Sequence, residues 1–210
     1  MKFFYALTFL ATLACGNGTD SGSGTGTLYT TIEVTGRPDD TKIELELSAR
    51  GNPVVGANVV FTDVDREQTV TAEGKNAGRY QANFNGYART IRVMVTSGED
   101  TLEAQLRGPA PHVITRPPND AIVRRAEFEV LDVEWDADDP ADSVEVIPED
   151  GDKLQLDQDN FEATLPLGPL KNGSQKLSVE RETSVDLSGG TEGSRFRSRY
   201  KVDNRFTLEG

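Results

Sequence analysis

The chain has 210 residues, 36% of them hydrophobic, and a formal net charge of −13 at pH 7. This hydrophobic fraction is enough for packed cores, and the length suits one large or two small domains. The acidic balance argues against nucleic acid as a partner, because the field of the protein repels phosphates. With one Cys and one His, the chain cannot build a zinc site from these residue types, which needs three or four ligands.

Residues 1–14 have the layout of a secretory signal peptide. Lys2 supplies a positive start, an uncharged apolar run follows, and small residues precede Cys15. The apolar run is shorter than the roughly 20 residues that a membrane-spanning helix needs. Ordinary cleavage after Ala14 is the alternative, and it would leave one free thiol in an oxidising compartment.

The residues that end this run, Ala11-Thr12-Leu13-Ala14-Cys15, resemble the lipobox of bacterial lipoproteins. The resemblance covers only the first fifteen or so residues, and it departs from the usual pattern at Thr12 and Leu13. It implies that Cys15 becomes the N-terminus and carries acyl chains, and more than one chain is what stable anchoring requires. By family analogy, the absence of an acidic residue after Cys15 favours the outer over the inner membrane.

The segment that follows is predicted to be a flexible tether. Residues 16–27 contain no apolar side chain and are rich in Gly, Ser and Thr, so they offer nothing to pack. The lipidated Cys15 and its tether are therefore assigned to residues 15–27, which would let a folded head move clear of the lipid surface.

From residue 28 onward the hydrophobic pattern has period two, which predicts strands rather than helices. Ile43, Leu45 and Leu47, for example, alternate with polar or charged residues. Seven such segments, separated by turn signals, occur in residues 28–107. Seven short strands in a stretch of this size are typical of a β-sandwich, which we assign to residues 28–108.

Two segments of this first domain resemble bacterial Ig-like and carboxypeptidase-regulatory-like modules. Residues 51–61 match their Gly-x-Pro-Val-x-Gly-Ala-x-Val turn and strand, and residues 78–84 match their Gly-x-Tyr strand. The resemblance implies the sandwich fold, but such modules serve as spacers, adhesin modules and binding domains alike.

A Pro-rich connection, residues 108–111, separates the first domain from a second β-rich segment. Proline prevents continuous strand pairing there. The second sandwich is assigned to residues 112–210, and its pattern loosely resembles fibronectin-III or Ig-like domains. The predicted fold class is therefore all-β, with two tandem Ig-like β-sandwich domains after a signal peptide and a tether.

Within the second segment, the alternation changes phase. Phe128 and Val130 share one parity, whereas Leu131, Val133 and Trp135 share the other. A one-residue slip turns every side chain to the other face, so a bulge or a switch of sheet is predicted near Leu131. Trp135 is predicted to anchor the core.

Acidic residues concentrate in residues 127–159, which hold fourteen Asp or Glu and one Lys. The densest loop carries Asp136, Asp138, Asp139 and Asp142, and a smaller cluster carries Asp63, Asp65 and Glu67. Calcium takes six to eight oxygen ligands from such loops, so the first set could form a calcium site. The alternative is a solvated acidic loop on an acidic protein.

A basic strand is the opposite feature. Alternation places the basic residues Arg195, Arg197, Arg199 and Lys201 on one face. They could bind an acidic polymer or a partner protein, but cross-strand pairing with acids of the same domain is the simpler expectation.

The sequence shows no recognisable catalytic machinery. His112 follows the Pro-rich connection and is interpreted as a linker residue, so a Ser-His-Asp arrangement is not expected. No phosphate-binding glycine loop occurs. Only a carboxylate mechanism would remain, with two converging carboxylates acting in hydrolysis.

These observations predict a lipid-anchored cell-envelope protein with a binding or structural role, no enzymatic activity and no cofactor. Its expected partners are the membrane, through Cys15, and a protein or a glycan, but not nucleic acid. A calcium-dependent adhesion or carbohydrate-binding module is the first alternative. A subunit of a carboxylate-based hydrolase is the second.

Overall fold

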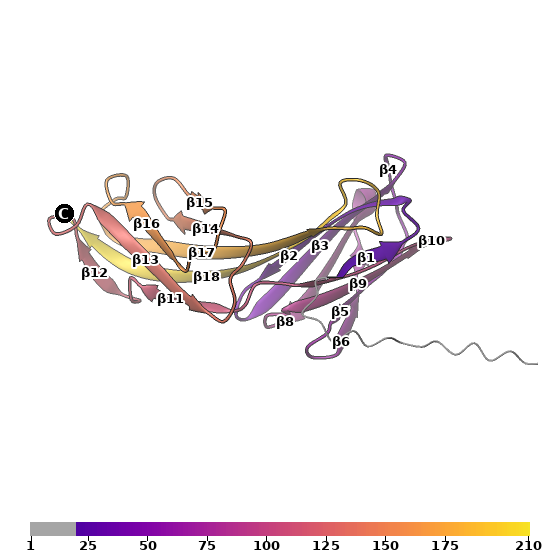
Figure 1. The fold of residues 1–210 in the computed structure, drawn as a ribbon, viewed down its shortest axis with the longest axis horizontal. Coiled ribbons are helices and arrows are strands. Elements are labelled where there is room, and N and C mark those ends of the chain that lie inside the picture. The colour runs from indigo at the N-terminus through magenta and orange to yellow at the C-terminus, as the bar shows by residue number, and fades with distance from the viewer. Residues whose placement is uncertain (1–19) are drawn as a thin grey trace, which may run out of the picture.

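The computed structural model describes residues 20–210, which fold as strands, turns and loops with one short 3-10 turn, η1 (Asn76–Gly78). Figure 1 shows an elongated molecule with a lobe at each end of one long sheet. In each lobe a smaller sheet packs over part of the long sheet, and apolar side chains fill the space between. The predicted all-β fold of two sandwiches is confirmed.

The long sheet has ten strands, and a hairpin of two long strands forms its centre. β17 (Gly173–Asp186) and β18 (Arg195–Glu209) pair along their whole length. The start of β18 pairs in parallel with β2 (Leu28–Gly36), and its end pairs in parallel with β12 (Ala121–Arg124). The other members are β3 (Asp40–Ala49), β4 (Asn52–Pro53), β7 (Glu73–Gly74), β8 (Arg79–Asn85), β14 (Ser143–Pro148) and β15 (Leu154–Leu156). The hairpin therefore runs through both lobes (Figure 1).

Two smaller sheets complete the lobes. The lobe that contains the start of β18 is called lobe 1, and the other is called lobe 2. A five-stranded sheet covers lobe 1, and its strands are β1 (Asp20–Gly24), β5 (Asn58–Asp63), β6 (Gln68–Thr71), β9 (Thr90–Ser97) and β10 (Asp100–Arg107). A three-stranded sheet covers lobe 2, and its strands are β11 (His112–Arg116), β13 (Val130–Ala137) and β16 (Glu162–Pro166). No helix in residues 20–210 is long and apolar enough to cross a membrane.

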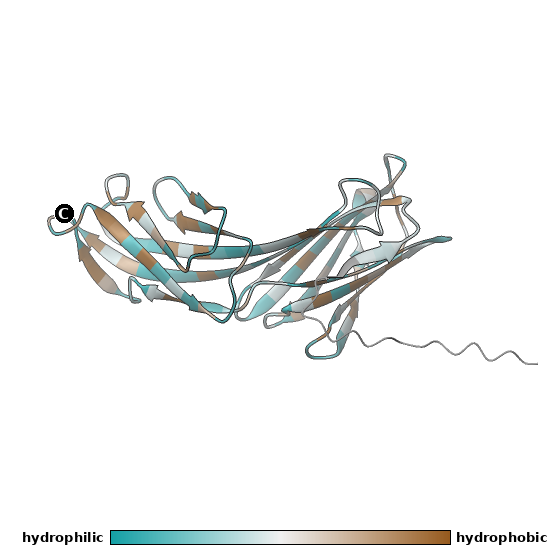
Figure 2. Ribbon diagram, in the orientation of Figure 1, coloured by the Kyte–Doolittle hydropathy of each residue, from teal (hydrophilic) through white to brown (hydrophobic). Residues whose placement is uncertain are grey.

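Period-two alternation explains why these segments form strands. In β2, Leu28, Ile32 and Val34 are buried against the core, while Tyr29 and Glu33 face solvent. Figure 2 shows the resulting alternation of apolar and polar bands along the strands. All seven strands predicted in residues 28–107 are present, and the structure adds the two-residue strands β4 and β7.

Each lobe has its own hydrophobic core, but the long hairpin contributes to both. Phe196 of β18 and Leu187, just after β17, are buried in the core of lobe 1. Leu177 of β17 and Phe206 of β18 are buried in the core of lobe 2. The predicted second domain, residues 112–210, therefore sends one end of its hairpin into the core of the first lobe.

The predicted tether is only partly described, and the described part is not a free tether. Residues 20–24 form β1, which pairs with β10 at the edge of the five-stranded sheet. Pairing needs backbone groups rather than apolar side chains, and small residues let the backbone come close. A Cβ on Gly24 would lie 2.4 Å from the carbonyl oxygen of Gly189. The signal peptide of residues 1–14 and the lipidation site Cys15 lie outside the described residues.

The phase change in residues 128–135 has a different cause from the predicted bulge. β13 begins at Val130 and pairs regularly with β16 through Leu131, whereas Phe128 lies before the strand and is exposed. The prediction of a bulge near Leu131 is therefore wrong. An irregularity does occur in the pairing of β11 with β13, between Ile114 and Arg116. Trp135 is buried in the core of lobe 2, as predicted.

The shared hairpin predicts that the two lobes unfold together. Replacing Phe196 with Ala empties a fully buried site and is expected to lower the free energy of unfolding by about 3–5 kcal/mol. Urea denaturation followed by Trp135 fluorescence, a probe in the other lobe, should report the same loss as far-UV circular dichroism. An unchanged fluorescence midpoint would show that the lobes unfold independently. Met94→Ala, at an exposed site of the same lobe, is the control.

Candidate functional site

The four aspartates predicted as a calcium site are all exposed: Asp136, Asp138, Asp139 and Asp142. Asp136 belongs to the end of β13, and the other three lie on the loop between β13 and β14. Asp139 accepts a hydrogen bond from Arg89 at 2.7 Å, which lowers the pKa of that carboxyl group. Asp142 accepts one from the backbone N–H of Ser184 at 2.9 Å. In residues 20–210 no group of three or more His, Cys, Asp or Glu is placed to hold a metal ion. This geometry lends the calcium hypothesis no support.

The smaller acidic cluster holds a turn together. Asp63 is fully buried, pairs with Arg66 and accepts the backbone N–H of Asp65 at 3.2 Å. Asp65 in turn accepts the backbone N–H of Thr90 at 3.1 Å. Glu67 has a positive φ of 54° and lies at the end of this turn. The carboxylates of Asp63 and Asp65 therefore fix the connection from β5 to β6 and to the start of β9.

A buried ion pair, which the sequence did not single out, lies where the two lobes meet. The side chains of Arg181 and Asp159 are both 0% exposed, and a guanidinium nitrogen lies 2.6 Å from Asp159 Oδ2. Other guanidinium nitrogens donate to the carbonyl oxygens of Ala110, at 2.7 Å, and Asp139. Ala110 belongs to the connection between the lobes, and Asp139 to the β13–β14 loop. One side chain thus holds three segments that are distant in sequence.

The carboxylate of Asp159 also has several hydrogen-bond partners besides Arg181. It accepts hydrogen bonds from Trp135 Nε1 and the backbone N–H of Ala141, both at 2.9 Å, and from the backbone N–H of Phe161 at 3.2 Å. A buried charge is stable only when it is paired and its remaining hydrogen-bonding positions are filled. The pair is thus a structural centre rather than a reactive one.

Aromatic rings fill the rest of this junction. The ring centroids of Tyr87 and Tyr200 lie 4.3 Å apart, and His112 meets Tyr200 edge-on at 5.4 Å. The Tyr87 hydroxyl donates to the carbonyl oxygen of Pro109 at 2.8 Å, and burial raises the pKa of that hydroxyl. His112, interpreted from the sequence as a linker residue, is instead the first residue of β11 and is buried, and neither ring nitrogen makes a hydrogen bond of normal geometry. Burial and the nearby Arg181 lower the pKa of His112 to about 4.

The predicted basic strand lies on the side of the long sheet that faces away from the core of lobe 1. We call this side, over β17, β18, β2, β3 and β8, the outer face. Arg197 reaches Glu182 at 3.2 Å, and Arg199 reaches the same carboxylate at 2.7 Å. Arg195 lies 3.4 Å from Asp186. Cross-strand pairing of the three arginines with acids is therefore confirmed, and Lys201 lies opposite Glu180 in the register.

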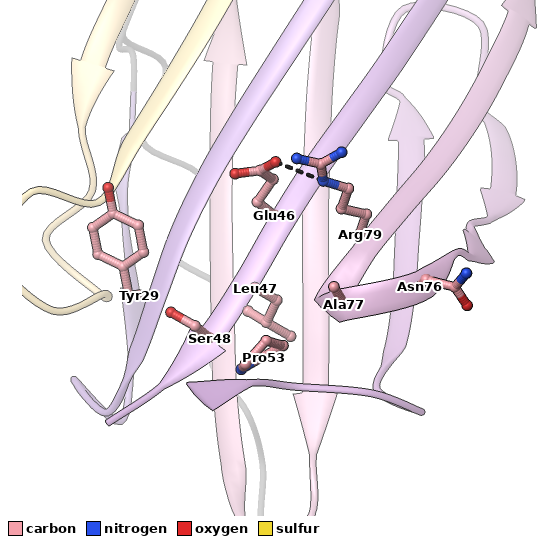
Figure 3. A pocket seen from close by; sticks show the side chains of 8 residues that line it. All are labelled: Tyr29, Glu46, Leu47, Ser48, Pro53, Asn76, Ala77 and Arg79. Carbon is pink, nitrogen blue, oxygen red and sulfur yellow. Dashed lines mark ion pairs between the residues drawn. The ribbon is translucent and has the colours of Figure 1, made fainter. Parts of the chain in front are cut away.

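Three shallow depressions adjoin one another on the outer face. The largest, of about 340 Å³, is shown in Figure 3, with Tyr29 on one side and the ion pair of Glu46 and Arg79 on the other. Tyr29 also borders a second depression of about 270 Å³, which reaches Arg197. Glu46 and Arg79 border a third of about 210 Å³. The shared residues make these three depressions continuous with one another.

Comparisons with known proteins give the chain no family. No protein-family model and no curated protein matches it. Among solved structures it is similar to the fibronectin(III)-like modules of CbhA from Clostridium thermocellum, at 13% identity over 86% of this chain and 94% of that one, with a TM-score of 0.30. It is also similar to the adhesin InvE from Yersinia pseudotuberculosis, at 14% identity over 88% and 61%, with a TM-score of 0.29. Scores this low carry no argument, so the fold and the site rest on this chain's own geometry.

The buried pair generates a stability prediction. Replacing Arg181 with Met leaves Asp159 charged and unpaired, and it is expected to cost about 3–5 kcal/mol of unfolding free energy. Adding Asp159→Asn should recover part of that loss, because the uncompensated charge is gone while an acceptor oxygen remains. Urea denaturation of both variants measures this.

The exposed pair of Arg195 with Asp186 provides the control. Arg195→Met is expected to change the unfolding free energy by less than about 1 kcal/mol, because solvent screens that pair. Equal losses for Arg181→Met and Arg195→Met would contradict the structural role of the buried pair.

The low pKa of His112 predicts a loss of stability in mild acid. The unfolded chain binds a proton near pH 6.5, whereas the folded chain does so only near pH 4. Stability is therefore complete above pH 6.5 and falls by about 3 kcal/mol as the pH drops from 6.5 to 4. Urea midpoints measured across this range should show that slope, and His112→Phe should flatten it. An equal slope in the variant would assign the effect to other groups.

Proposed function

We propose that this protein is a lipid-anchored component of the bacterial cell envelope that acts by binding and has no enzymatic activity. The observation that carries the proposal is the continuity of the molecule. One hairpin runs through both lobes, and a buried ion pair fixes their connection. A molecule whose two lobes are rigidly connected can present a binding surface in a fixed orientation.

The anchor and the fold together limit how the protein stands on its membrane. Cys15 is followed by few residues before β1 begins at Asp20. Five residues span at most about 17 Å when fully extended. Lipid on Cys15 would therefore keep lobe 1 near the membrane surface. The C-terminus lies at the far end of lobe 2 (Figure 1). By analogy with bacterial lipoproteins, we place the anchor in the outer membrane.

The absence of enzymatic activity is supported by the use made of the acidic side chains. Among the described residues the buried carboxylates are Asp63 and Asp159, and each is paired with an arginine. Both carboxylates also accept backbone N–H groups, so their oxygens are occupied within the protein and are not presented to a substrate. The hydrolase alternative thus gains no support from this geometry, and neither does the calcium alternative.

The anchor is tested by replacing Cys15 with Ser. The variant is expected to lose incorporation of labelled palmitate and to move from the membrane to the soluble fraction, because no other residue can receive the thioether-linked lipid. Ser23→Ala, a small change in β1, is the matched control and should leave the protein in the membrane fraction. A Cys15→Ser protein that stays fully membrane-bound would overturn the lipid anchor.

A further inference from the structure

The charges of the outer face balance one another, unlike those of the chain as a whole. In the part over lobe 1, the ion pairs involve five basic residues and six acidic ones: Lys42, Arg79, Arg195, Arg197 and Arg199 with Glu33, Glu44, Glu46, Glu180, Glu182 and Asp186. With Lys201, which lies on the same face, basic and acidic side chains of this part are equal in number on a chain whose net charge is −13. It exerts little attraction on an ionic ligand, but it offers many fixed donors and acceptors.

The register of the sheet arranges these groups in rows across the strands. Arg195, Thr31, Glu46 and Arg79 lie side by side on four successive strands. Neighbouring strands are about 4.8 Å apart, so such a row extends for about 14 Å. The three adjoining depressions follow this direction, because the largest shares Tyr29 with one neighbour and Glu46 with the other. The surface is a shallow track rather than a closed pocket.

One aromatic ring stands beside this track. Tyr29, the second residue of β2, is 40% exposed and borders two of the depressions. Gly193 lies against the ring, since a Cβ there would be 3.5 Å from Cε2. Figure 3 shows the ring and the pair of Glu46 with Arg79 on either side of the hollow. An exposed ring flanked by planar charged groups offers an apolar platform with hydrogen-bonding partners on each side.

We propose that the outer face binds an uncharged polysaccharide chain, with one sugar ring stacked on Tyr29. This inference rests on the proposed binding role and names its ligand class. A sugar presents an apolar C–H face to an aromatic ring and hydroxyl groups at its rim. Carboxylates and guanidinium groups whose charges are already paired can hydrogen-bond those hydroxyls without a net charge on the ligand.

The other polymer classes fit this face less well. An anionic polymer meets a balanced face on a strongly acidic protein, so long-range repulsion opposes it. An extended peptide binds by adding a strand to a sheet edge. Beside Tyr29, β2 is paired with β3 on one side, and its pairing with β18 begins at Thr31. Before Thr31, the backbone on the β18 side is bonded to the β17–β18 loop, since the Thr30 N–H donates to Ser194 Oγ and the Leu28 carbonyl oxygen accepts the Thr191 N–H.

Affinity electrophoresis on native gels tests the proposal. The full-length chain, purified in detergent, would run through gels containing soluble galactomannan, xyloglucan, dextran or β-1,3-glucan, with alginate as the anionic polymer. At least one neutral polymer is expected to retard the protein. Tyr29→Ala should weaken that binding about tenfold, and Tyr29→Phe, which keeps the ring, should stay within about twofold. Phe128→Ala, which removes an exposed ring in lobe 2, should have no effect.

Three results would overturn the proposal: no retardation by any neutral polymer, retardation by alginate alone, or binding that Tyr29→Ala leaves unchanged. Melting temperatures equal to that of the wild type confirm that each variant is folded. The fractionation of Cys15→Ser is a separate readout. If no neutral polymer retards the protein but Cys15→Ser leaves the membrane, only the proposal of a glycan ligand is refuted. If Cys15→Ser stays in the membrane and still binds the glycan, only the lipid anchor is refuted.

Discussion

The ion pair of Arg181 with Asp159 is the interaction on which the arrangement of the two lobes depends. Taking both charges out of water is costly, and it is tolerated because the two groups bond each other and the polar groups of Trp135, Ala141 and Ala110. Those bonds reach the inter-lobe connection at Ala110 and the indole of Trp135. Any movement of one lobe against the other would strip hydrogen bonds from a buried charge. The connection is therefore a fixed joint, although its Pro-rich sequence suggests a simple linker.

The long hairpin is the second constraint, and it acts through the backbone. β18 pairs in parallel with β2 at one end and with β12 at the other, so strands from both lobes join one hydrogen-bonded sheet. Bending at the junction would break this pairing and expose the rings of Tyr87 and Tyr200. Backbone pairing and the buried ion pair thus resist the same motion by independent means. Lobe 2 is held at a set distance from β1, the strand nearest the predicted anchor.

Local patterns predicted the strands well, because alternation depends only on which face a side chain must bury. They did not predict how the strands join into sheets. The bond from the Thr30 backbone N–H to Ser194 Oγ joins residues 164 positions apart, and no short-range pattern encodes it. β1 was missed because it lacks apolar side chains, although its backbone pairs normally. Arg181 did leave a signal, since it shares the inward parity of Leu177 and Val179, but its partner Asp159 is hidden among exposed acids.

The outer face is nearly neutral and the loops are acidic, and this difference follows from the structure of a sheet. A sheet face must pair its charges across strands, because like charges side by side destabilise the sheet, so the outer face approaches neutrality. Loops carry no such requirement, and the acidic surplus accumulates there, as in the loop that contains Asp138. That surplus keeps the protein soluble and repels anionic surfaces. The balanced outer face is thus the part of the molecule where an uncharged ligand meets the least electrostatic opposition, and the fixed joint keeps it in one orientation.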